Sequence, residues 1–203
     1  MKYPFFASFI VLCLLLMYEI HKARNREAQK YQSFLDEEAK ANATRRQSLE
    51  DLQYITIPFE TLPADILTED EYVKEYLETL HILSETKIVN FTGLSNTELK
   101  LKYGAPNIDI LSQYDANYTS LVRTLNDWAH LLYQKGYVSE ARTILEFAVS
   151  TNTDISTTYN LLAQIYKDSN ETEKIKELIP IASGINSLMS KSIVKNLERY
   201  LEE

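Results

Sequence analysis

The sequence predicts an all-α protein, in which an N-terminal single-span helix and a stalk precede a short α-solenoid with a C-terminal capping helix. Only 4 Gly and 5 Pro occur among 203 residues, which is poor in turn formers for an all-β or dinucleotide-binding fold. A long uncharged run stands near the N-terminus, and apolar residues recur at helical spacing from residue 107 onward. With 45% hydrophobic and 25% charged residues, the chain can bury one principal core.

The uncharged run predicts a transmembrane anchor over residues 1–20. From residue 3 to residue 18 the chain carries no charged side chain, and Lys2 and Glu19 flank this run. As a helix the run would be about 24 Å long, which is shorter than the ~30 Å hydrocarbon core of a bilayer. A flanking lysine can reach the lipid headgroups, so we expect a short single-pass membrane segment.

Three other interpretations of the uncharged run are a cleaved signal peptide, a lipoprotein signal and a buried core helix. A cleaved signal peptide ends in small residues, but this run passes directly into polar and charged residues. A lipoprotein signal would place a small residue before Cys13, where Leu12 stands. A buried core helix is rarely apolar on all sides at the start of a chain. The anchor is the favoured interpretation, and the cleaved signal peptide is its closest alternative.

The charges that flank the run predict its orientation. Lysine and arginine follow the run at residues 22, 24, 26 and 30 but precede it only at residue 2. The positive-inside rule therefore places the rest of the chain in the cytoplasm. Several N-x-S/T sequons would instead suit a secreted glycoprotein, although a chain rich in Asn and Thr produces such sequons by chance. The sequons begin at Asn42, Asn90, Asn117 and Asn170.

The distribution of charge excludes one class of partner. Residues 51–203 contain 13 Lys and Arg against 23 Asp and Glu, a net charge of −10. Nucleic acid is not an expected partner, because this part lacks the clustered cationic face that neutralises phosphates. Nine of these acids lie in residues 51–85, where Lys74 alone opposes them. This acidic stretch is interpreted as a solvated surface, with a docking site for a basic partner as the alternative.

The middle of the chain divides into three predicted parts. Residues 21–53 are rich in helix-forming polar residues without sustained heptads, so they predict a solvated helical stalk and not a coiled-coil dimer. Residues 54–67 contain two prolines and predict an extended connector. A helical domain is expected over residues 68–203, beginning with a helix from about Thr68 to Ser84 that has acids in its first turn.

A strongly amphipathic helix is expected between residues 107 and 136. Residues 87–106, which precede it, are mixed, because KIVNF is briefly strand-like and NTELKLKY is helix-like. After residue 107, apolar residues alternate in steps of three and four, which places them on one stripe of a helix. The stripe consists of Leu111, Tyr114, Tyr118, Leu121, Leu125, Trp128 and Leu132. Gly136 is suited to end this helix.

The last third of the chain repeats with a period of 34 residues. A shift by that interval aligns apolar and small residues along two consecutive helices, and Gly136 with Asn170 at the turn. The other aligned pairs are Leu125 with Tyr159, Trp128 with Leu162, Ala129 with Ala163, Leu132 with Tyr166, Ala141 with Ile175, Ile144 with Leu178, Leu145 with Ile179, and Ala148 with Ala182. Two helices in each unit of this length predict stacked helical hairpins.

This pattern resembles the tetratricopeptide repeat (TPR) superfamily over residues 122–203. In WAHLLYQKGYVSEARTILEFA, Ala129 stands where the family has a small residue in its first helix, and Ala141 and Ala148 allow the second helix to approach closely. In the next unit Ile175 replaces a small residue, and the family's proline after each second helix is absent. The resemblance implies repeats over residues 122–155 and 156–189.

The resemblance also implies how the stack ends. A third half-unit over residues 190–203 would be a capping helix, because stacked repeats need a polar outer face. About three repeats are usually needed for stability, so residues 68–102 are expected to contribute a degenerate hairpin at the other end.

The resemblance further implies a groove, because the family's first helices line a concave surface. Polar residues of these helices that are not needed for packing would face another protein or a peptide segment. They are Arg123, Asn126, His130 and Tyr133 in the first repeat, and Asn160, Gln164 and Lys167 in the second. An ordinary solvated helix face is the alternative interpretation.

No catalytic constellation is recognised in the sequence. The three histidines, His21, His81 and His130, lack a second ligand at helical spacing, and no nucleotide-binding or nucleophile-elbow motif occurs. We therefore expect no enzyme activity, no cofactor and no metal. The expected function is a membrane-tethered adaptor or scaffold for protein binding. The alternative is an extracytoplasmic structural subunit of a cell-envelope or secretion complex.

Overall fold

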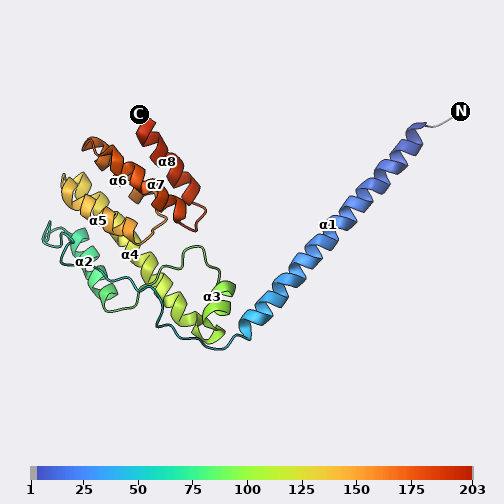
Figure 1. Cartoon of the computed structure of the whole chain (residues 1–203), viewed down its shortest axis with the longest axis horizontal. Helices are drawn as coiled ribbons and strands as arrows, with labels where there is room; N and C mark the ends of the chain where they lie inside the picture. Colours follow the sequence, from blue (N-terminus) through green and yellow to red (C-terminus); the bar gives the residue numbers. More distant parts are fainter. Residues whose placement is uncertain (1–3, 203) are drawn as a thin grey trace. The chain divides into compact units, whose positions relative to one another are not determined.

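The fold is helical throughout the part of the chain that the structure describes. This computed structural model describes the backbone of residues 4–202 and the side chains of residues 8–202. Eight α-helices and one 3-10 turn, η1, make up this range, and no strand occurs in it, so the all-α prediction is confirmed (Figure 1). The elements are α1 (Pro4–Asn42), α2 (Glu71–Ser84), α3 (Asn96–Tyr103), η1 (Ala105–Asn107), α4 (Ile108–Gln134), α5 (Val138–Ser150), α6 (Ser156–Asp168), α7 (Thr172–Gly184) and α8 (Ser190–Glu202).

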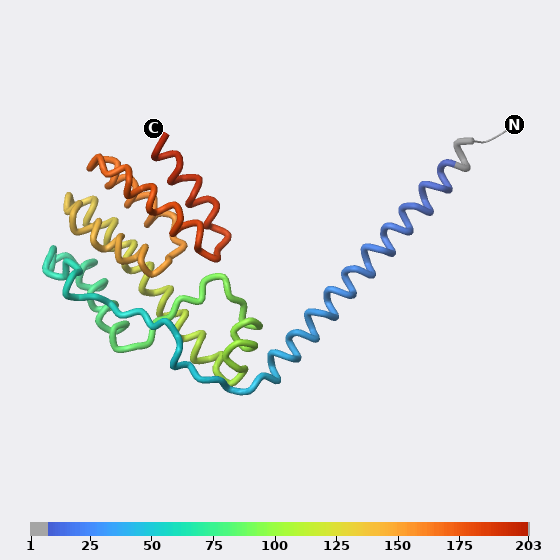
Figure 2. Tube along the Cα trace, viewed as in Figure 1, coloured from blue at the N-terminus to red at the C-terminus, as the bar shows by residue number. Residues whose placement is uncertain are grey.

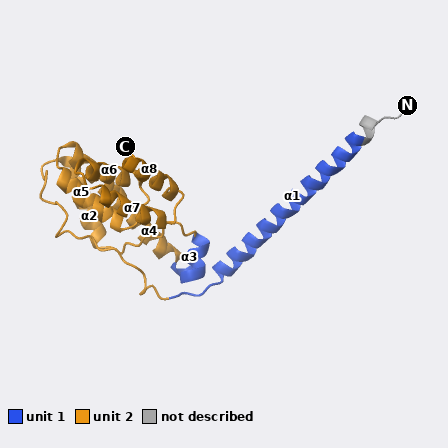
Figure 3. Ribbon diagram, turned by 45° about the horizontal axis from the view of Figure 1, so that its top comes forward, with its two compact units in different colours: residues 1–47, 96–107 blue, residues 48–95, 108–203 orange. Residues whose placement is uncertain are grey.

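The chain forms two compact units (Figure 3). The first contains residues 1–47 and 96–107, and therefore the elements α1, α3 and η1. The second contains residues 48–95 and 108–203, and therefore α2 and α4 to α8. The α3 helix packs with α1 within the first unit, whereas α2 packs with α4 within the second. The expectation of a degenerate hairpin over residues 68–102 is thus wrong.

The first unit is held together where α1 ends. The predicted helical stalk extended to residue 53, but α1 ends at Asn42 and the following residues are irregular. The main chain turns away because it binds the other segment of this unit: the Gln47 amide donates to the Tyr103 carbonyl at 3.0 Å, and the Ala105 amide donates to the Thr44 carbonyl at 3.1 Å. These tertiary hydrogen bonds replace the helical ones that composition alone favours.

The predicted transmembrane anchor is not supported. Residues 1–3 lie outside the described residues, and among the described ones no helix combines the length and the apolar character needed to cross a membrane. Glu19 follows the uncharged run directly and lies within α1. The prediction of a single-pass membrane protein with a cytoplasmic domain is therefore wrong for this range.

An extended segment leads into the helices of the second unit. Figure 2 shows the path of this segment toward the helices. The rings of Tyr54 and Tyr114 on α4 meet edge to face with centroids 5.9 Å apart, and Phe59 stacks on His81 of α2. The Ile55 amide donates to the carbonyl of Ile88. The KIVNF stretch is thus paired at this point, but it forms no strand.

The α2 helix begins at Glu71, slightly later than the start near Thr68 that the sequence predicts. Asp70, not Thr68, is the N-cap residue, and its carboxylate accepts a hydrogen bond from the Tyr72 amide at 3.0 Å. An aspartate at this position satisfies one free amide and also interacts favourably with the positive end of the helix dipole. The helix ends at Ser84, the residue that the sequence predicts.

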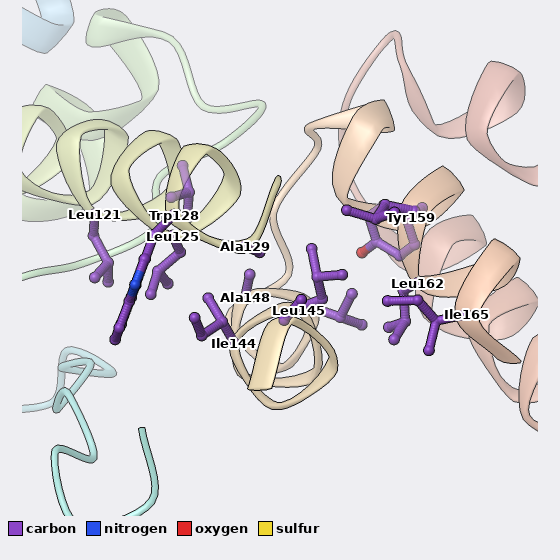
Figure 4. Close-up of a cluster of buried hydrophobic side chains, with 14 of the residues drawn as sticks. Leu121, Leu125, Trp128, Ala129, Ile144, Leu145, Ala148, Tyr159, Leu162 and Ile165 are labelled. Atoms are coloured by element: carbon purple, nitrogen blue, oxygen red, sulfur yellow. The ribbon is translucent and has the colours of Figure 1, made fainter. Parts of the chain in front are cut away.

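The core of the second unit consists of the apolar residues that recur in the sequence. In Figure 4 the side chains of α5 lie between those of α4 and those of α6. Both members of most aligned pairs are buried, including Trp128 with Leu162 and Ala129 with Ala163 at 0% exposure. Ile193 and Leu197 on α8 are also fully buried. Burial of one such side chain stabilises the fold by about 1.5–3 kcal/mol, so these residues fix how the helices pack.

The backbone repeats at the turns as well. Gly136, between α4 and α5, has a φ of +90°, and Asn170, between α6 and α7, has a φ of +60°. Only glycine adopts this left-handed conformation freely, and asparagine tolerates it better than most residues. The pairing of Gly136 with Asn170 in the sequence therefore reflects one shared turn geometry.

Candidate functional site

The predicted site residues lie on α4 and α6, and the structure separates them into different environments. Asn160 and Gln164 line a hollow together with residues of α8. Arg123 on α4 lines other hollows, and the side chain of Asn126 is hydrogen-bonded to Thr157. No single surface therefore contains all seven predicted residues.

A polar hollow of about 330 Å³ lies between α6 and α8. Its lining residues are Asn160, Gln164, Asn196, Arg199 and Tyr200. The amides of Asn160 and Asn196 approach to 3.4 Å, a long contact at the weak end of hydrogen bonding. The third amide, Gln164, donates to Asp168 at 2.8 Å on the exposed side of α6. These amides retain donors and acceptors for a ligand, because an amide has four hydrogen-bonding positions.

Positive charge lies at the edge of this hollow. Arg199 lines it, and the ammonium group of Lys167 stands over the ring of Tyr200, 6.0 Å from the centroid. The prediction named Asn160, Gln164 and Lys167 but missed the residues of α8, because α8 was expected to be only a polar cap. The signal that could have found them is the repeat itself, since Asn196 stands close to one period after Asn160.

Asn126 has a structural role in the described fold. Its side-chain oxygen accepts hydrogen bonds from Thr157 at 2.9 Å and from Thr158 at 3.1 Å, and its amino group donates to Asp127 at 3.0 Å. These contacts join α4 to the first turn of α6. The sequence cannot show them, because they connect residues about one repeat apart.

Arg123 lies between two further hollows. One of them, about 410 Å³, lies between α2 and α4 and is also lined by Glu75 and Asp127. The other, about 360 Å³, lies beside the start of α6 and is also lined by Asp115 and Asp154. The Arg123 side chain is exposed and forms no ion pair within the described part of the chain.

The remaining two predicted residues are half-buried on α4. Tyr133 packs against the hydrophobic core of the unit. The Nε2 atom of His130 is buried without a hydrogen-bond partner among the described residues. Neither residue lines the hollow between α6 and α8.

Comparison with known proteins adds no relative. No family model, curated protein or solved structure matches the chain. Within residues 4–202, no three His, Cys, Asp or Glu side chains are grouped as metal ligands. Function must therefore be argued from the surfaces themselves.

Proposed function

We propose that the chain is a protein-binding adaptor or scaffold whose TPR-like helical repeats hold a peptide segment of another protein in the hollow between α6 and α8. One observation carries this proposal: three amide side chains from two helices, Asn160, Gln164 and Asn196, line that hollow together. The recurrence of buried apolar residues at 34-residue intervals supports the assignment of a repeat architecture.

The chemistry of the hollow suits a main chain more than an apolar ligand. Side-chain amides can donate to carbonyl groups and accept from amide groups, which are present in every peptide regardless of its sequence. The hollow is lined mainly by polar side chains, so burial of a hydrophobic molecule would gain little there. The residues that line this hollow include no nucleophile paired with a base, and our proposal assigns them a binding role.

Site-specific photo-crosslinking tests this function. A photoreactive amino acid replaces Gln164 in the full chain, which is then illuminated in its native cells and analysed for covalent adducts. We expect covalent adducts with specific proteins. The double substitution of Asn160→Ala and Asn196→Ala should reduce the adduct yield by about tenfold, which corresponds to a loss of roughly 1.4 kcal/mol of binding free energy.

The matched control places the photoreactive residue at Lys176, on the exposed side of α7. Adducts that form equally at both positions, or that persist in the double variant, would show that the hollow between α6 and α8 does not select a partner.

A further inference from the structure

The two ends of the helix stack in the second unit are built differently. At one end, Lys135 in the turn before α5 lies 3.6 Å from Asp70 at the start of α2, and Arg142 on α5 lies 2.6 Å from Glu171 in the turn before α7. The other end is formed by three loops: residues 88–94, 151–155 and 185–189. These loops follow α2, connect α5 to α6, and connect α7 to α8, respectively (Figure 1).

Hydrogen bonds fix the three loops to one another. The Asn90 amide donates to the carbonyl groups of Thr151 and Asn152 at 2.9 and 3.2 Å, respectively. The Asn186 amide donates to the Gly93 carbonyl at 3.1 Å. Gly93 has a φ of +82°, and a side chain there would collide with Asn186. This end is therefore a rigid platform, and a partner would not need to order it first.

Apolar side chains stand uncovered on this platform. Leu188 is 100% exposed, Met189 is 43% exposed and Leu94 is 37% exposed. Leu188 and Met189 line a hollow of about 660 Å³ together with Gly93 and Asp154. A single exposed leucine is ordinary, but Leu188 and Met189 line one hollow, and Leu94 lines the neighbouring one. Apolar residues grouped in this way on fixed loops are typical of an interaction surface.

The carboxylates beside these apolar residues determine the charge of the partner. Asp154 lines both the Leu188 hollow and the neighbouring hollow that contains Asp115. Asp154 accepts a hydrogen bond from Ser187 at 2.6 Å, but neither aspartate forms an ion pair with a cation of the described residues. Burial raises the pKa of Asp115, and a hydrogen bond from the backbone of Phe91 opposes this shift. Arg123 lines the same hollow as Asp115 but does not line the hollow of Leu188 and Asp154.

We propose that this loop platform, defined by residues 88–94, 151–155 and 185–189, docks a protein segment that carries a large apolar side chain next to a lysine or arginine. The apolar side chain would pack on Leu188 and Met189, and the cation would pair with Asp154. A second copy of the chain is a poorer occupant, because its net charge of −8 would repel this acidic surface. The surface shares no residue with the hollow between α6 and α8.

Selection from a random dodecapeptide library against the full-length chain tests the proposal. We expect enriched peptides to contain an aliphatic or aromatic residue within two positions of a lysine or arginine. Their dissociation constants should rise by about tenfold in Leu188→Ser, which removes an apolar contact, and in Asp154→Asn, which keeps the shape but removes the charge. Raising the salt concentration should weaken binding to the native chain more than to Asp154→Asn.

Two controls separate this surface from others. Val138→Ser changes a residue that is 40% exposed at the opposite end of the stack, and it should leave peptide binding unchanged. The substitutions Asn160→Ala and Asn196→Ala should also leave it unchanged, which keeps this test independent of the proposed function. The proposal is overturned if no peptide is enriched, if Leu188→Ser binds the enriched peptides as well as the native chain does, or if sedimentation shows self-association that Leu188→Ser abolishes.

Discussion

At the scale of single residues, two buried tyrosines show how the same type of side chain can have different energetic roles. The Tyr118 hydroxyl donates to the Thr151 carbonyl at 3.1 Å and accepts from Asn90 at 2.9 Å. Burial raises its pKa to about 12, so the hydroxyl stays protonated over the physiological range. The Tyr159 hydroxyl is equally enclosed, but it has no hydrogen-bond partner among the described residues.

We predict opposite effects when each hydroxyl is removed. Tyr118→Phe should lower the free energy of unfolding by about 0.5–1.5 kcal/mol, because it removes hydrogen bonds that the fold uses. Tyr159→Phe should leave stability unchanged or raise it by up to about 1 kcal/mol, because it removes a buried group that nothing satisfies. Urea unfolding of both variants measures the difference. Equal destabilisation by the two substitutions would contradict this account of Tyr159.

The sequons illustrate a limit of motif-based prediction at the same scale. The side-chain amide of Asn90 donates to the platform loops, and that of Asn117 donates to the Lys87 carbonyl at 3.0 Å. Both side-chain nitrogens therefore donate hydrogen bonds within the fold, and these bonds would have to break before either nitrogen could carry a glycan. A sequon match depends only on three consecutive residues, whereas the availability of its nitrogen depends on contacts across the chain.

At the scale of helices, the sequence predicts local periodicity well and tertiary partners poorly. The boundaries of α4, α5, α6 and α7 follow from apolar spacing, because a buried stripe and a left-handed turn residue are local properties. The pairing of α3 with α1 could not be predicted, since α3 is short and weakly amphipathic and its partner lies far away in the sequence. The α8 side of the candidate hollow was missed for a different reason, because α8 was interpreted only as a polar cap.

An ion-pair network at the turn before α7 provides a prediction on helix connections. Arg142 on α5 donates to both carboxylate oxygens of Glu171, at 2.6 and 3.1 Å, and this interaction lowers the pKa of Glu171 below its ordinary value of 4.5. A carboxyl with a lowered pKa stabilises the fold above its unfolded pKa. That contribution is lost as the pH falls through the folded pKa.

We expect Arg142→Gln to return the pKa of Glu171 toward 4.5 and to weaken the acid-dependent part of the stability curve. Carboxyl chemical shifts followed by NMR during a pH titration measure this change. Lys176→Gln is the matched control, because Lys176 pairs with Glu173 on the exposed side of the same helix. An unchanged pKa of Glu171 in Arg142→Gln would show that the contact with Lys174 alone is sufficient to keep this pKa low.

At the scale of the whole molecule, two separate units follow from two kinds of packing. The second unit has a continuous core of apolar side chains from the repeated helices. The first is held mainly by polar contacts near Gly104: Lys100 pairs with Glu38 at 3.3 Å, and Asn107 donates to the Gln47 carbonyl at 2.9 Å. The Lys100–Glu38 pair is only partly buried. Such pairs contribute less stability than a continuous apolar core, so the first unit is expected to open more easily than the second.

Gly104 allows this difference to be tested. It has a φ of +91°, and an added Cβ would lie only 2.2 Å from the backbone oxygen of Arg45. Gly104→Ala should therefore separate the two segments of the first unit, at a cost of about 1–3 kcal/mol from the backbone conformation alone. Hydrogen exchange followed by mass spectrometry should show faster exchange in residues 38–47 and 96–107, with unchanged protection in α4 to α8.

Gly136→Ala is the control for backbone strain without collision. Gly136 has nearly the same φ, +90°, but nothing lies within 4 Å of the position that its Cβ would occupy. Its substitution should lower the stability of the second unit by a similar strain energy while leaving exchange in residues 38–47 unchanged. If Gly104→Ala instead accelerated exchange equally in both units, the chain would unfold as one cooperative body, and the separation into a polar and an apolar unit would have no energetic meaning.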